Sequence, residues 1–227
     1  MGVHDGHRDR LRRSFIEYGL DSFSDVNALE LLLFYAIPRR DTNETSHELL
    51  NRFGSLSAVF DASQQELCQV PGIGENTAAL IKLVPQILKK ARVSETSDMT
   101  SIRNSDDAGR YLMPRFINEK DELVLMLCLD SRRRVIKCIE LGRGVVNSVE
   151  INIRRVVETA LKCKADSVII AHNHPEGIAL PSNEDKSVTR QIFRSLDLVG
   201  ITLADHIIVA GEDYVSFSDS GMFRAYI

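Results

Sequence analysis

The sequence lacks the marks of a membrane protein, an exported protein and a cysteine-based zinc ribbon. Its 227 residues contain no apolar run of the ~18 residues that a transmembrane helix needs. The polar segment 1–13 has no apolar core of the kind that a secretory signal carries. The four cysteines are scattered without a Cys-x-x-Cys pair, so neither a zinc ribbon nor a disulfide framework is expected. We therefore expect a cytoplasmic protein without a membrane segment.

The sequence also has little excess charge and no repetition. It carries 28 basic and 32 acidic residues, a net charge of −4, so the chain as a whole lacks the basic character typical of nucleic-acid binding. No low-complexity tract and no solenoid-like period is present. Apolar residues make up 44% and charged residues 26%, which is the mix of a folded globular protein of one or two domains.

The hydrophobic pattern divides the chain into a helical part and a mixed part. Residues 1–92 show helical patterns and no convincing strand. Residues 93–104 are rich in Ser and Thr without periodicity, which predicts a linker. Residues 105–227 alternate between helical and strand patterns, and a mixed sheet flanked by helices is the simplest arrangement for them. The expected fold class is α+β.

Individual elements follow from the same pattern. In the first part, helices are expected at 45–53, closed by Gly54, and at 77–91, with Asp25 and Asn27 able to cap a further helix. In the second part, strands are expected at 122–129, 135–141, 167–171, 201–210 and 214–217. Helices are expected there at 106–117 with Ser105 as N-cap, at 149–162, and from 182 or 183 to about 198.

Two histidines directly after the strand expected at 167–171 indicate a metal site. His172 and His174 are separated by one residue, and in an extended chain such residues point to the same face. A polar loop follows, and then a helix start with a carboxylate, Asp185, in its first turn. Two histidines and one carboxylate leave a tetrahedral zinc ion with an open fourth position for water, as in catalytic zinc sites. Such a water has a pKa lowered toward ~7 and can act as a nucleophile.

A hydrolase of this kind needs a base that is not itself a ligand, and Glu122 at the start of the first strand is the best candidate. Simpler interpretations stay open. The pattern Ser182-x-x-Asp185 is also an ordinary helix cap, a His-x-His pair also occurs on protein surfaces, and Glu122 could be only a charged strand end. The combination of all three favours a metal site.

A nucleobase deaminase site is excluded by the residues. It needs His-x-Glu followed by Pro-Cys-x-x-Cys, whereas position 174 is histidine and no such cysteine pair exists. His206 lies inside an apolar strand pattern, which favours a hydrogen-bonded core histidine over a partner of the metal site.

The pattern His172-x-His174-Pro175, six further residues, and Ser182-x-x-Asp185 matches the JAMM (MPN+) motif of zinc metalloproteases. Together with the segments 205–209 and 214–217, and with N-terminal segments such as Phe53-Gly54-Ser55-Leu56, it resembles the bacterial RadC family (UPF0758) over nearly the whole chain.

The resemblance implies an N-terminal helical domain at 1–92 and a C-terminal MPN/JAMM domain of cytidine-deaminase-like α/β/α fold at 105–227. It implies that His172, His174 and Asp185 bind Zn²⁺. It also implies that Ser182 helps to hold an oxyanion and that Glu122 moves a proton from water to the leaving amine. The expected activity is hydrolysis of a peptide or isopeptide bond in an unknown peptide or protein substrate, and hydrolysis of a non-peptide amide stays open as an alternative.

Residues 67–81 resemble a helix-hairpin-helix, in which Gly72 and Gly74 permit a tight turn and let backbone N–H groups meet a phosphate. DNA is the usual partner, with Lys82 on the following helix as a further contact. The alternative is a purely structural turn, since acidic and basic residues nearly balance in 1–92 and Glu75 would repel a phosphate. A non-catalytic, DNA-associated scaffold is therefore the second functional hypothesis.

Overall fold

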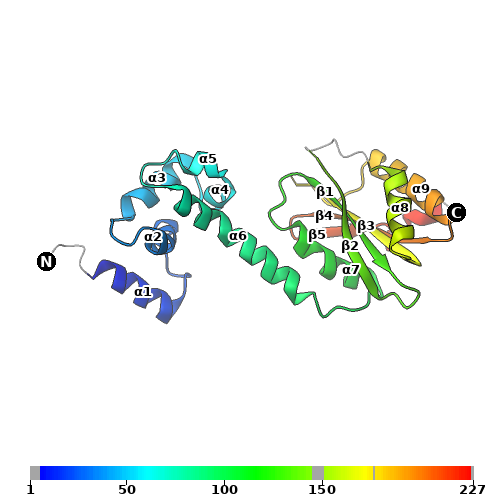
Figure 1. Ribbon diagram of the computed structural model, residues 1–227, viewed down its shortest axis with the longest axis horizontal. Helices are drawn as coiled ribbons and strands as arrows, with labels where there is room; N and C mark the ends of the chain where they lie inside the picture. The colour runs from blue at the N-terminus through cyan, green and yellow to red at the C-terminus, as the bar shows by residue number, and fades with distance from the viewer. Residues whose placement is uncertain (1–5, 145–150, 176, 226–227) are drawn as a thin grey trace. The chain divides into compact units, whose positions relative to one another are not determined.

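The computed structural model describes residues 6–144, 151–175 and 177–225. The chain forms two compact units, one up to Leu88 and one from Lys89 onward, so that both share helix α6, Glu75–Glu95 (Figure 1). In the part of the chain that the structure describes, no helix combines the length and the apolar character needed to cross a membrane.

The first unit is helical, as predicted. Its helices enclose a core of leucine, isoleucine, valine and alanine side chains that includes Leu29, Leu49 and Ile81. Before α6 the helices are α1 (His7–Tyr18), α2 (Asp25–Ala36), α3 (Asn43–Phe53), α4 (Leu56–Asp61) and α5 (Gln64–Leu67).

Polar caps set the ends of these helices. Gly54 ends α3 with φ +87°, the left-handed conformation that glycine adopts at low cost. The start of α2 differs from the prediction: Ser24, not Asp25 or Asn27, is the N-cap, and its hydroxyl accepts the backbone N–H of Asn27. A serine at the N-cap fits because its short side chain reaches a backbone N–H of the first turn.

The second unit contains a mixed five-stranded sheet of order β2-β1-β3-β4-β5, which confirms the α+β fold class. Strand β1 runs antiparallel to β2 and β3, β3 runs parallel to β4, and β5 is antiparallel to β4. The strands are β1 (Glu122–Leu129), β2 (Val135–Gly144), β3 (Ser167–Asn173), β4 (Thr202–Ala210) and β5 (Asp213–Ser216). The helices are α7 (Ser105–Leu112), α8 (Ile153–Lys162), α9 (Asn183–Asp197) and the 3₁₀ turns η1 (Met113–Phe116) and η2 (Met222–Ala225).

Helices cover both faces of this sheet (Figure 1). On one face, α7 packs on alternate residues of β1, such as Leu125 and Leu127. On the other face, α8 and α9 pack on the intervening residues, such as Val124 and Met126. Because both faces are covered, β1 and β3 are apolar along nearly their whole length rather than alternating. We call the second face the α8/α9 face.

Several predicted boundaries are corrected by the structure. The helix expected at 106–117 has Asn104 as its N-cap instead of the predicted Ser105. It ends at Leu112 and is followed by η1 from Met113, because Pro114 has no N–H for an α-helical hydrogen bond. The helix expected at 149–162 is observed from Ile153; residues 149 and 150 lie outside the described residues.

The predicted domain limits stay a prediction, but the segment 93–104 is ordered in this structure. Helix α6 runs through Glu95, Ser101 forms a β-bridge with Arg134, and Ile102 is buried in the core beside α7. The segment is therefore packed on the second unit, because it contributes an apolar side chain to its core.

Candidate metal centre

Three predicted ligands meet at one end of the sheet, on the α8/α9 face. His172 is the second-to-last residue of β3, and His174 follows the strand directly. Strand β3 extends two residues beyond the predicted strand. Asp185 lies in the first turn of α9. Nε2 of His172 lies 3.1 Å from Nε2 of His174 and 3.1 Å from Oδ1 of Asp185, and His174 Nε2 lies 3.6 Å from Asp185 Oδ2. One donor atom from each residue falls within 4.8 Å of the others.

Asp185 is held in place by a capping box with Ser182. The backbone N–H and the hydroxyl of Ser182 donate to Oδ2 of Asp185 at 2.8 and 2.6 Å, and Ser182 Oγ accepts the N–H of Asp185 at 3.0 Å. The helix-cap interpretation of this pattern is therefore confirmed as a structural fact. It does not compete with ligation, because Oδ1 of the same carboxylate faces His172.

The orientation of His174 is set by its own loop. Nδ1 of His174 lies 3.0 Å from the backbone carbonyl oxygen of Ile178. A carbonyl oxygen only accepts, so Nδ1 carries the proton and the lone pair of neutral His174 is on Nε2, which faces the other two donors. Gly177 permits this close turn, since a Cβ atom there would lie 3.2 Å from Cβ of His174.

Asp185 is ionised at neutral pH. Burial alone would raise the pKa of its carboxyl group, but the hydrogen bond and charge of His172, and the hydrogen bonds from Ser182, outweigh burial and lower the pKa below its ordinary value. Two imidazole groups and one carboxylate are the donor types that zinc prefers. The residues present therefore fit a zinc ion.

Strand register places Glu122 beside this cluster. Val124 pairs with His172 in the antiparallel ladder, so Glu122, two residues earlier in β1, shares the face and the sheet end of His172. The side chain of Asn173 fixes this end: its Oδ1 accepts the N–H of Leu123 at 2.7 Å, and its Nδ2 donates to the carbonyl of Asp121 at 3.1 Å. Asn173 was missed in the sequence, although its place between two ligand histidines could have singled it out.

Comparison with known proteins identifies the family of this chain. Residues 102–222 match the RadC-like JAB domain family, and residues 6–79 match the UPF0758 N-terminal family. The chain belongs to the RadC (UPF0758) family. A UPF0758 protein of Fusobacterium nucleatum is 34% identical over 226 residues, which cover 96% of this chain and 97% of that protein. A UPF0758 protein of Pseudoalteromonas translucida is 38% identical over 215 residues, covering 94% of this chain and 95% of that protein.

His206 of this RadC-family chain is buried in the core, as the sequence favoured, but its partner is a predicted ligand. Its Nε2 lies 2.8 Å from Nδ1 of His172, and its ring stacks on Phe217 at a centroid distance of 5.0 Å. Burial is the main reason that the pKa of His206 lies well below its ordinary value, and the charges of His172 and His174 lower it further. Sequence reasoning missed Thr189, which contacts the other nitrogen of His206.

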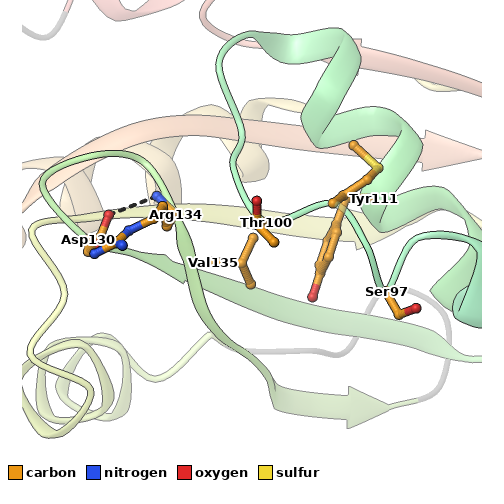
Figure 2. A pocket seen from close by; sticks show the side chains of 7 residues that line it. Ser97, Thr100, Tyr111, Asp130, Arg134 and Val135 are labelled. Carbon is orange, nitrogen blue, oxygen red and sulfur yellow. Dashed lines mark hydrogen bonds and ion pairs between the residues drawn. The ribbon is translucent and has the colours of Figure 1, made fainter.

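A hollow of about 410 Å³ in the same unit is separate from the metal cluster. Figure 2 shows the Asp130–Arg134 ion pair at one end and Tyr111 at the other, with Thr100 and Val135 between them. Tyr111 and Val135 pack on the α7 side of the sheet, whereas the metal donors lie on the α8/α9 face. This hollow therefore does not contribute to the candidate metal centre.

The residues predicted to contact DNA are only partly brought together. Gly72 and Gly74 line a hollow of about 760 Å³ in the N-terminal unit, together with Arg39 and Arg40 from the segment after α2. Lys82 is not among its lining residues, and its Nζ donates to the backbone carbonyl of Phe60 at 2.7 Å. The DNA contacts stay a prediction, and the two arginines are the basic groups that the hairpin prediction had not included.

Proposed function

We propose that this RadC-family protein is a zinc-dependent hydrolase that cleaves peptide or isopeptide bonds in a protein substrate in the cytoplasm. The convergence of His172, His174 and Asp185 carries the proposal. His172 lies near the end of β3, His174 directly after it and Asp185 at the start of α9, and one donor atom from each residue forms a single cluster. Zinc bound by three protein ligands supplies Lewis acidity and keeps a fourth coordination position open.

Glu122 is proposed to move the proton. Its register position puts it at the same sheet end as His172, and Asn173 holds the backbone on either side of it. A carboxylate there can take a proton from the attacking water and pass it to the leaving amine, as general acid–base catalysis requires.

The main role proposed for Ser182 is to hold the side chain of Asp185. Its one hydroxyl proton is donated to Oδ2 of that ligand. The predicted contact of Ser182 with an oxyanion therefore requires the hydroxyl to exchange this partner during the reaction.

Zinc content of untagged protein, measured by mass spectrometry, tests the metal site first. We expect near-stoichiometric zinc in the wild-type protein and its loss in His174→Ala. His47→Ala is the matched control, because His47 is an exposed histidine of α3. Wild-type protein that stays free of zinc after incubation with the ion contradicts the proposal.

Cleavage is tested with the zinc-loaded protein on a peptide library that includes lysine-linked isopeptides. We expect cleavage that EDTA abolishes and that falls at least 100-fold in Glu122→Gln, since a positioned acid–base group contributes about 10²–10⁴-fold. Glu140→Gln, an exposed carboxylate of β2, should retain wild-type rates. Cleavage that survives EDTA, or that is equal in Glu122→Gln, rejects the mechanism.

A second function, binding of nucleic acid by the N-terminal unit, is supported by a hollow that Arg39 and Arg40 share with Gly72 and Gly74. Glu75 lines the same hollow, so the two arginines face one acidic side chain there. Fluorescence anisotropy with labelled duplex DNA at two salt concentrations tests it. Binding should weaken as salt rises and should weaken in the double variant Arg39→Ala/Arg40→Ala, because phosphate contacts release counterions. Arg13→Ala, an exposed arginine of α1, is the control. Equal binding by all three proteins argues against this site.

A further inference from the structure

A buried chain of three hydrogen bonds connects two of the proposed ligands through the core. His172 Nδ1 lies 2.8 Å from His206 Nε2, and His206 Nδ1 lies 2.6 Å from the hydroxyl of Thr189. The hydroxyl of Thr189 lies 2.5 Å from the backbone carbonyl oxygen of Asp185. His206 and Thr189 are 1% and 0% exposed. We call this chain, from His172 through His206 and Thr189 to the Asp185 carbonyl, the relay.

Counting protons fixes the direction of every bond in the relay. The carbonyl of Asp185 only accepts, so the single hydroxyl proton of Thr189 is directed at it. The oxygen of Thr189 must then accept from Nδ1–H of His206. A neutral His206 has its lone pair on Nε2 and accepts from Nδ1–H of His172. His172 therefore donates this bond through Nδ1–H, and its Nε2 is the nitrogen that faces His174 and Asp185.

Both ring nitrogens of His206 are occupied inside the core, Nε2 by His172 and Nδ1 by the hydroxyl of Thr189, and its ring stacks on Phe217. Burial lowers the pKa of His206, and the nearby carboxylate of Asp185 acts in the opposite direction. The carboxylate of Asp205, its neighbour in sequence, is occupied by Ser216, the N–H of Ser218 and the backbone N–H of His206.

A β-bulge in β4 brings His206 to the metal face. Val168 of β3 pairs with Leu203, but the next residue, Ile169, pairs with Asp205, so Ala204 is the extra residue. Strict alternation from Leu203, which packs on the α8/α9 face, would turn His206 toward α7. The bulge reverses the alternation after Ala204, and bulges commonly re-aim side chains beside functional sites.

We propose that His206 and Thr189 are positioning residues of the metal site, which hold the ring of His172 so that its Nε2 is directed at His174 and Asp185. This inference rests on the proposed function, because it assigns these two residues a role in holding the metal. The relay also ties the end of β3 to the start of α9, the two elements that supply the ligands.

Thr189→Val is the most direct test, because it replaces only the hydroxyl by a methyl group of similar size. Without this acceptor, the buried Nδ1–H of His206 has no partner, and the ring avoids that loss by moving its proton to Nε2. His206 then donates to Nδ1 of His172, and the proton of His172 moves to Nε2, where it blocks the metal. Thr189→Ser keeps the hydroxyl and should restore the wild-type arrangement.

Two measurements follow from this. In metal-free, ¹⁵N-labelled protein, long-range ¹H–¹⁵N correlation spectra report which ring nitrogen of each histidine carries the proton, with signals of His206 assigned from His206→Gln. Zinc affinity is measured by competition with a chromophoric chelator at pH 7.5. Circular dichroism confirms that each variant is folded. Ser46→Ala is the matched control, because Ser46 is a buried hydroxyl that donates to the carbonyl four residues earlier in α3.

We expect the Nδ1–H form of His206 in wild-type protein and in Thr189→Ser, and a shift toward the Nε2–H form of His206 in Thr189→Val. The zinc dissociation constant should rise about 10–100-fold in Thr189→Val, as is usual when a partner of a ligand histidine is lost. In Thr189→Ser and Ser46→Ala the zinc dissociation constant should stay within about threefold of the wild-type value, below the rise of about 10–100-fold expected for a lost partner. An Nε2–H form of His206 in the wild type, or wild-type zinc affinity in a folded Thr189→Val, overturns the relay. Wild-type protein with the expected proton positions but no zinc binding overturns the proposed function instead.

Discussion

Asp185 has two roles in this structure, as a helix cap and as a proposed ligand, and one set of substitutions separates them. Its carboxylate accepts two hydrogen bonds from Ser182 and closes the capping box of α9. Asp185→Ala removes both bonds, which we expect to lower the free energy of unfolding of the metal-free protein by about 1 kcal/mol. Asp185→Asn keeps a carbonyl oxygen that can accept from Ser182, so its cost without metal should be roughly half as large.

Zinc changes this comparison if Asp185 is a ligand. At a free zinc concentration 100 times the dissociation constant, binding stabilises the wild-type fold by about 2.7 kcal/mol. The difference between wild type and Asp185→Ala should therefore grow from about 1 to nearly 4 kcal/mol. For a unit of this size the zinc-dependent part corresponds to a rise in melting temperature of roughly 8 °C, which both Asp185 variants should lack.

Scanning calorimetry in EDTA and in zinc measures these shifts. Ser182→Ala is the matched control, because it removes the N-cap hydroxyl but leaves the proposed ligand. It should lose about 1 kcal/mol in EDTA and keep a zinc-dependent rise in melting temperature, smaller than that of the wild type, whereas both Asp185 variants should show none. If zinc raises the melting temperature of Asp185→Asn as much as that of the wild type, Asp185 is only a cap and our assignment of the ligands is wrong.

Three further predictions concern the scaffold of the site. Glu119 forms ion pairs with Lys89 and Arg143. Burial alone would raise the pKa of its carboxyl group, but these two partners outweigh burial and lower it. Glu119→Gln should therefore lower the free energy of unfolding by roughly 1 kcal/mol at pH 7, measured by urea unfolding. Because the folded-state pKa is lowered, this difference should shrink as pH falls below the unfolded pKa of about 4.3; a constant difference would refute the ion-pair explanation. Gly109→Ala should lower the melting temperature although alanine favours helices, because a Cβ atom there would lie 2.8 Å from the ring of Tyr214; unchanged stability would show that the ring moves away freely. Asn173→Ala should speed amide hydrogen exchange at Leu123, which loses its acceptor, while Asn173→Asp should largely preserve protection; equal exchange in all three proteins would contradict the role given to Asn173.

The sequence was sufficient for the layered fold because its strands and helices carry unambiguous patterns. The apolar run at Glu122–Leu129 is buried on both faces of the sheet, and such a run is typical of a central strand. The end of β3 was harder to predict. The strand continues through His172 and Asn173, where polar side chains imitate the start of a loop, and only the ladder with β1 shows that the backbone is still extended.

The metal ligands could be predicted from sequence because they are close together in the chain, whereas their supporting residues are not. Asp185 and His172 come from neighbouring segments with a recognisable spacing. Thr189 and His206 come from α9 and β4, and their contact depends on the bulge at Ala204. A bulge breaks the two-residue period on which face assignments rest, so a sequence pattern assigns His206 to the wrong face.

The capping box also explains how a metal site can be prepared before the metal binds. A free aspartate side chain samples several rotamers, and fixing one of them has an entropic cost at the moment of ligation. In this chain the two bonds from Ser182 hold the carboxylate in one orientation as soon as α9 forms, with Oδ1 toward His172. Folding therefore orders the Asp185 side chain through the cap, and zinc would bind a carboxylate that is already in place. The zinc affinity of Ser182→Ala should accordingly be lower than that of the wild type, although Ser182 provides no ligand atom itself.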